Sequence, residues 1–132
     1  MPEDPAGKCA VSVHYYTPAT YCILKQDADW GKAKKAWGSP RDYGELETNM
    51  DLLYDTFVSK GVPVIIGEFG VETANKEADN VKLFLSAVST EARERDMCPV
   101  LWDITNVFYD RTTFQMVEEY SDLNEMLTAP VE

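Results

Sequence analysis

The chain has 132 residues, of which 45% are hydrophobic and 27% are charged, and this length and composition predict one globular domain. Twelve basic and 23 acidic residues give a formal net charge of -11, which argues against nucleic acid and anionic membranes as partners. We expect neither a transmembrane helix nor a signal peptide, because the sequence has no long apolar run and begins with Met-Pro-Glu-Asp-Pro.

Three cysteines and one histidine do not suggest a metal site. Cys9, Cys22 and Cys98 lie far apart, so they indicate neither a closed disulfide framework nor a tetrahedral zinc site, although one disulfide pair remains open. Because free cysteine is often buried, we expect Cys9 and Cys98, which stand beside strand-like runs, to be small core residues. We expect no metal and no cofactor.

At the N-terminus, two prolines and a glycine predict an irregular tail over residues 1–7, with the folded domain over residues 8–128. The short apolar run at residues 9–13 predicts the first β-strand. His14 and Tyr16 follow the end of this strand.

The segment 17–43 has no hydrophobic periodicity, and a connection of this length is usually a binding loop or disordered. It contains Trp30 and Trp37. Exposed indoles are costly, so these residues either pack back on the domain or stack on a ligand, and both alternatives stay open. We interpret the basic run at residues 32–35 as a solvated face rather than a docking patch.

Three helices are predicted from apolar residues at three- and four-residue spacing. The first covers residues 44–60 and is closed by Gly61 after its C-cap. The second begins after an N-cap at Asn75 and ends near residues 95–96, before Pro99. Residues 100–102 predict a strand, and a less regular stripe from Phe114 to Leu127 predicts the last helix.

The central stretch is Val-Pro-Val-Ile-Ile-Gly-Glu-Phe-Gly at residues 62–70. Its apolar run has no polar alternation, which predicts a strand buried on both faces of a parallel sheet. Glu68 stands at the end of the run, and Gly67 and Gly70 leave room for close approach of a ligand or another backbone. Ligands bind at the carboxyl ends of parallel strands, so Glu68 is either a site residue or a solvated residue that opens a loop.

The predicted order of strand, long loop, helix, strand, helix, strand and helix is typical of parallel βα units with right-handed crossovers. The three strands end at residues 14–16, at Glu68 and at Trp102. If the strands are adjacent and parallel, these side chains converge on one rim of the sheet.

These strand ends carry a family resemblance. Residues 11–18 (Val-Ser-Val-His-Tyr-Tyr-Thr-Pro), 65–70 (Ile-Ile-Gly-Glu-Phe-Gly) and 101–103 (Leu-Trp-Asp) resemble, in order and spacing, the last three βα units of glycoside hydrolase family 5, the endo-β-1,4-glucanase (cellulase) and mannanase family. The Asp-Arg pair at residues 110–111 also resembles the pair before that family's final helix. The resemblance implies strands six to eight of a TIM (β/α)8 barrel that hydrolyses β-linked polysaccharides with retention, in an extracellular parent protein.

Particular roles are also implied by this resemblance. Glu68 matches the nucleophile on the seventh strand, and His14 and Tyr16 match the sixth-strand pair that hydrogen-bonds around the nucleophile and the substrate. Trp102 matches the tryptophan that forms the floor of the sugar site. The residue types suit this chemistry, because a carboxylate attacks the anomeric carbon, a phenol orients it and an indole accepts the apolar face of a pyranose. Trp30 and Trp37 are further candidate sugar contacts.

One departure concerns the second carboxyl group. Retaining cleavage needs it about 5–5.5 Å from the nucleophile, and in this family it belongs to an Asn-Glu pair at the end of the fourth strand. No such pair precedes His14, and the Asn-Glu pair at residues 124–125 lies in the predicted last helix. A full barrel has roughly 250 residues, so we expect a glycoside hydrolase fragment that is inactive alone.

Two alternatives stay open. The chain is a non-catalytic carbohydrate-binding module that uses Trp30, Trp37 and Trp102, or it is an interaction piece that completes its sheet with another copy or with a missing N-terminal half-barrel.

Overall fold

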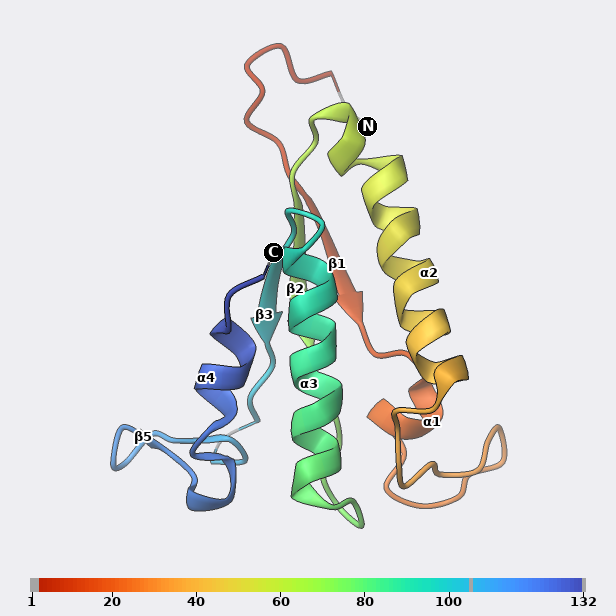
Figure 1. The fold of residues 1–132 in the computed structure, drawn as a ribbon, viewed down its shortest axis with the longest axis vertical. Helices are drawn as coiled ribbons and strands as arrows, with labels where there is room; N and C mark the ends of the chain where they lie inside the picture. The colour runs from red at the N-terminus through yellow and green to blue at the C-terminus, as the bar shows by residue number, and fades with distance from the viewer. Residues whose placement is uncertain (1–2, 105, 132) are drawn as a thin grey trace.

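The computed structural model describes residues 3–104 and 106–131, so part of the predicted tail, residues 1–2, lies outside the described residues, as does Thr105 in the predicted loop. Three parallel strands form one sheet in the order β1 (Val11–Tyr15), β2 (Val64–Phe69) and β3 (Cys98–Leu101). The other elements are α1 (Ala19–Cys22), α2 (Pro40–Thr56), η1 (Val58–Lys60), α3 (Ala78–Arg93), β4 (Tyr109–Asp110), β5 (Gln115–Met116), η2 (Glu118–Tyr120) and α4 (Leu123–Thr128). In Figure 1, β1 and β3 point in the same direction on either side of α3, which lies in front of β2. The predicted α/β fold with a parallel sheet is confirmed.

Helix α2 begins four residues earlier than the apolar stripe predicts. Ser39 caps it, and the Asp42 carboxylate accepts hydrogen bonds from the Ser39 amide (3.0 Å), the Ser39 hydroxyl (2.8 Å) and the Gly38 amide (3.1 Å). Lys34 forms an ion pair with the same carboxylate. At its other end the helix passes into η1, and Gly61 adopts the left-handed conformation (φ 78°) that the sequence predicts for the residue after the C-cap.

Replacing Asp42 by Asn is expected to lower the free energy of unfolding by about 2 kcal/mol at pH 7. Burial alone would raise the pKa of Asp42, but the hydrogen bonds from Lys34, Ser39 and Gly38 outweigh burial and lower the pKa to about 2. Since this folded-state pKa lies below the ordinary value of 3.8, the stabilisation is present above pH 3.8 and is lost as the pH falls towards 2. Urea unfolding of the wild type and of Asp42→Asn at pH 7 and at pH 2 measures the loss of stability at each pH. An equal loss at the two pH values would contradict the prediction.

The start of α3 and the segment after β3 differ from the prediction. Asn75 is not the N-cap: it lies in the left-handed region (φ 61°), its side-chain amide donates to the Lys25 carbonyl (3.2 Å), and Glu77 is the N-cap. The predicted last helix is wrong over its first half, where β5 pairs with the preceding β4 in an antiparallel hairpin and Phe114 is 75% exposed at φ 58°. Within the predicted segment only α4 is an α-helix. The residues before it form strand β5 and the 3-10 helix η2.

The sheet is covered on one face. Val64, Ile66 and Phe69 of β2 are buried against the helices, but Ile65 is 37% exposed on the other face. The prediction that β2 is buried on both faces is therefore wrong, because none of the helices in the described residues covers the second face of the sheet. Ile65 pairs with Ser12 on one side and with Cys98 on the other. We call this uncovered surface the open face.

Two of the three cysteines are exposed rather than buried. Cys9 and Cys98 are exposed and Cys22 is buried, and all three are free thiols. The expectation that Cys9 and Cys98 are core residues is wrong, because Cys98 lies level with Ile65 on β3 and Cys9 precedes the first residue of β1. Among the described residues, no helix combines the length and the apolar character needed to cross a bilayer.

Candidate active site

A one-residue register shift decides where Glu68 points. Along β1 and β2, Val13 pairs with Ile66 but His14 pairs with Glu68, so Gly67 has no partner of its own. An extra residue of this kind reverses the alternation of side chains. As a result Glu68 shares a face with His14, while Ile66 and Phe69 both remain buried against the helices.

Gly67 packs closely on the Ser12 side chain of β1. A Cβ atom on Gly67 would lie 2.7 Å from the Ser12 hydroxyl oxygen, which is closer than real Cβ contacts. The absence of a side chain therefore lets β1 and β2 approach each other beside Glu68.

Two side chains from the end of β1 contact one oxygen of Glu68. The Tyr16 hydroxyl donates to Glu68 Oε2 at 3.1 Å, and His14 Nδ1 lies 3.3 Å from the same oxygen. The Glu68 side chain is 25% exposed, so it is reachable from the open face. The structure thus brings together three residues that the sequence places at the ends of two strands.

Tyr16 is held in its protonated form. Burial raises the pKa of the phenol to about 12, and the hydrogen bond to Glu68 and the charge of Glu68 raise it as well. At neutral pH the phenol is therefore a hydrogen-bond donor to the Glu68 carboxylate, and this bond fixes the orientation of the carboxylate.

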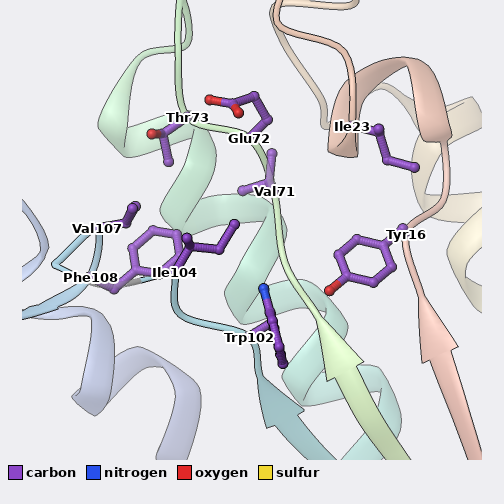
Figure 2. Close-up of a pocket in the computed structure, with 9 residues that line it drawn as sticks. All are labelled: Tyr16, Ile23, Val71, Glu72, Thr73, Trp102, Ile104, Val107 and Phe108. Atoms are coloured by element: carbon purple, nitrogen blue, oxygen red, sulfur yellow. The ribbon is translucent and has the colours of Figure 1, made fainter.

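A pocket of about 280 Å³ lies beside this group. Its lining residues are Tyr16, Ile23, Val71, Glu72, Thr73, Trp102, Ile104, Val107 and Phe108. Figure 2 shows the Tyr16 ring and the Trp102 indole on either side of the chain that leaves β2. Gly70 lies between them, because a Cβ atom there would stand 3.3 Å from the Trp102 carbonyl and 3.6 Å from the Tyr16 ring. Trp102 is 48% exposed, so its indole is available to a ligand.

The other two tryptophans lie elsewhere. Trp30 is 61% exposed, in a turn closed by the bridge between Ala28 and Gly31, and it is not among the pocket-lining residues. Trp37 is only 4% exposed and packs on Tyr43 and Phe84, with ring centroids 4.6 and 5.4 Å away. The expectation of a sugar contact from Trp37 is corrected, because a buried indole has no free face.

Several pocket residues were not singled out from the sequence. Glu72 and Thr73 stand two and three residues after the central stretch, and this position is the signal that could have identified them. Ile23 and Phe108 lie in segments without periodicity, so only the folded chain brings them to Tyr16 and Trp102. Over residues 3–104 and 106–131, no cluster of three or more histidine, cysteine or acidic side chains is placed to hold a metal.

Comparison with known proteins gives consistent results. The sequence profile of cellulase (glycosyl hydrolase family 5) matches residues 1–107. Endoglucanase A of Clostridium longisporum is 36% identical over 103 residues, which cover 78% of this chain and 19% of that protein. Endoglucanase A of Paenibacillus barcinonensis is 28% identical over 123 residues, which cover 85% of this chain and 30% of that protein.

Solved structures show the same similarity. A broad-specificity endoglucanase of glycoside hydrolase family 5, subfamily 4, from an uncultured bovine rumen ciliate superposes with a TM-score of 0.85 at 29% identity, covering 98% of this chain and 42% of that one. A family 5 lichenase mutant from Caldicellulosiruptor sp. F32, in complex with cellotetraose, gives a TM-score of 0.80 at 28% identity, covering 96% of this chain and 36% of that one. The chain thus spans less than half the length of these relatives.

Proposed function

Since this chain belongs to glycosyl hydrolase family 5, the cellulase family, we propose that it is the C-terminal part of an endo-β-1,4-glucanase barrel with Glu68 as the nucleophile. The observation that carries the proposal is the pair of contacts on Glu68 Oε2, from Tyr16 at 3.1 Å and His14 at 3.3 Å, at the carboxyl end of a parallel sheet. In this assignment β1, β2 and β3 are strands six, seven and eight of the barrel.

The reaction is hydrolysis with retention in two steps. Glu68 attacks the anomeric carbon and forms a covalent glycosyl-enzyme, while the leaving sugar oxygen takes a proton from an acid. Water then attacks the same carbon, gives its proton to the conjugate base of that acid and releases Glu68. Tyr16 and His14 orient the attacking carboxylate, and Trp102 supports the apolar face of a pyranose.

In this proposal the acid that the reaction needs comes from outside these 132 residues. The sequence has no Asn-Glu pair upstream of His14, and the chain covers 19% and 30% of two relatives. The full-length protein is therefore the enzyme, acting outside the cell on a β-1,4-glucan, with mannan, xyloglucan or mixed-linkage glucan as alternative substrates. The relative that binds cellotetraose supports the glucan. Loss of turnover on replacing Glu68 in the full-length protein is the test.

A non-catalytic carbohydrate-binding role is the second candidate, and the pocket beside Trp102 favours it. If Trp102 is a sugar platform, cellopentaose titrated into the purified chain should change the tryptophan fluorescence. Trp102→Ala is expected to weaken this binding about tenfold, because losing about 60 Å² of buried apolar contact at about 25 cal/mol per Å² costs about 1.5 kcal/mol. Trp30→Ala is the matched control and should leave the affinity unchanged. No response at millimolar cellopentaose would argue against both the platform and the binding role.

The open face has a consequence for assembly. Val100 (45% exposed), Trp102 and Ile65 leave apolar surface uncovered, and β1 and β3 each have one unpaired edge in the described sheet. Such edges pair readily with other chains, and two-fold symmetry is the commonest arrangement. We expect the isolated chain to form a dimer or higher oligomer in place of its contacts with the N-terminal half-barrel. Sedimentation equilibrium over a hundredfold concentration range checks this, and a strict monomer throughout would contradict it.

A further inference from the structure

One wall of the pocket beside Trp102 is built from two segments that lie far apart in the sequence. Ile23 belongs to the segment 22–25, which follows α1, and Val71, Glu72 and Thr73 belong to the segment 71–76, which follows β2. In Figure 2, Ile23, Glu72 and Thr73 all lie at the end of the pocket away from Trp102, with Ile23 and Glu72 on neighbouring segments. The shape of this wall therefore depends on what holds the two segments together.

The two segments are joined by hydrogen bonds. The Glu72 amide donates to the Cys22 carbonyl at 2.8 Å, and the Asn75 side chain donates to the Lys25 carbonyl at 3.2 Å. Lys76 adds contacts to both sides, because its Nζ donates to the Leu24 carbonyl at 3.3 Å and to the Glu72 carbonyl at 2.6 Å. One ammonium group thus bridges the backbones of both segments.

The surroundings of Lys76 make these bonds strong. Its side chain is half-buried, and its Nζ lies 5.3 Å from the centre of the Tyr21 ring, which is fully buried. Hydrogen bonds from a charged donor are about twice as strong as those between neutral groups, and the face of an aromatic ring attracts a cation. Burial lowers the pKa of Lys76, and the negative charge of Glu72 opposes this shift.

From these contacts we propose that Lys76 is a positioning residue for glycan binding: its ammonium holds the segment 71–76 against the segment 22–25 and so forms the pocket wall that faces Trp102. This role rests on the proposed function of the pocket. Lys76 itself does not line the pocket, so it acts through Ile23, Glu72 and Thr73.

Three variants separate this role from a general effect on stability. Lys76→Met keeps the apolar stem and removes the donors, whereas Lys76→Arg keeps a charged donor. Lys82→Met is the matched control, because it removes another ammonium group that bridges two segments, through ion pairs with Asp79 (3.0 Å) and Asp122 (3.1 Å), and Lys82 does not line the pocket. The measurement is hydrogen exchange of the Glu72 amide, whose bond to Cys22 joins the two segments.

In Lys76→Met we expect the Glu72 amide to exchange about tenfold faster or more, as local opening increases, while buried amides of α3 keep their rates. Lys76→Arg should restore most of the protection. An unchanged rate in Lys76→Met, or an equal increase in Lys82→Met, overturns the positioning role.

Titration with cellotetraose, followed by tryptophan fluorescence, connects the wall to binding. We expect the Kd to rise about tenfold in Lys76→Met and to stay unchanged in Lys82→Met. Equal affinities in the wild type and Lys76→Met would overturn the positioning role alone. No response in the wild type would instead overturn the proposed sugar-binding function of the pocket, and with it the role of Lys76 in binding.

Discussion

The isolated chain is expected to hydrolyse carboxymethylcellulose at least about 10²–10⁴ times more slowly than the full-length protein, because this is the usual contribution of a general acid or base. Glu68 has its orienting partners, Tyr16 and His14, within the chain. The second carboxyl group that retaining cleavage needs has no counterpart upstream of His14. Release of reducing sugar by equal amounts of the two proteins measures the difference.

Two substitutions in the full-length protein complete this test. Glu68→Gln should lower kcat by about 10³-fold or more, since removing a catalytic nucleophile costs at least that much in well-studied enzymes. Glu47→Gln on the exposed surface of α2 removes the same charge away from the site and should leave kcat unchanged. Robust turnover by the isolated chain, abolished by Glu68→Gln, would show that an acid lies within these residues.

Asn80→Ala is expected to lower the free energy of unfolding by about 3 kcal/mol or more, because a buried polar group left without a partner costs about 1–3 kcal/mol. Asn80 Oδ1 accepts from the Tyr21 hydroxyl (2.9 Å) and the Trp37 amide (2.8 Å), and Nδ2 donates to the Trp37 carbonyl (2.7 Å). Tyr21 and Trp37 are both buried, so water does not readily replace these bonds. The long connection before α2 would lose the three hydrogen bonds that join it to Asn80 of α3.

Tyr21→Phe is the control for the Asn80 prediction. It removes one of the three bonds and keeps the ring that packs on Phe84, so we expect a loss of about 1 kcal/mol. Urea unfolding, with the midpoint and the m-value fitted separately, compares the variants. If Asn80→Ala is no more destabilising than Tyr21→Phe, the contacts with the Trp37 backbone do not contribute.

Much of the fold could be predicted from local patterns in the sequence. The stripe around Leu46 and Met50 is recovered in α2, the stripe from Val81 to Ala92 in α3, and Gly61 lies after η1 with positive φ. Hydrophobic periodicity works here because each helix buries one side against the sheet. The convergence of Tyr16, Glu68 and Trp102 followed from the parallel order of the strands.

The sequence by itself determined which residue types stand at the strand ends, and only the tertiary structure decided which of them meet. The shift at Gly67 turns Glu68 towards His14, and it depends on how β2 pairs with β1, a strand about 50 residues earlier in the sequence, as well as on Gly67 itself. In the same way, the burial of Trp37 depends on a contact with Asn80. This residue lies more than 40 residues away in the sequence but next to Trp37 in the fold. The burial and the direction of these side chains depend on contacts between segments that are distant in the sequence, and local hydrophobic periodicity does not predict such contacts.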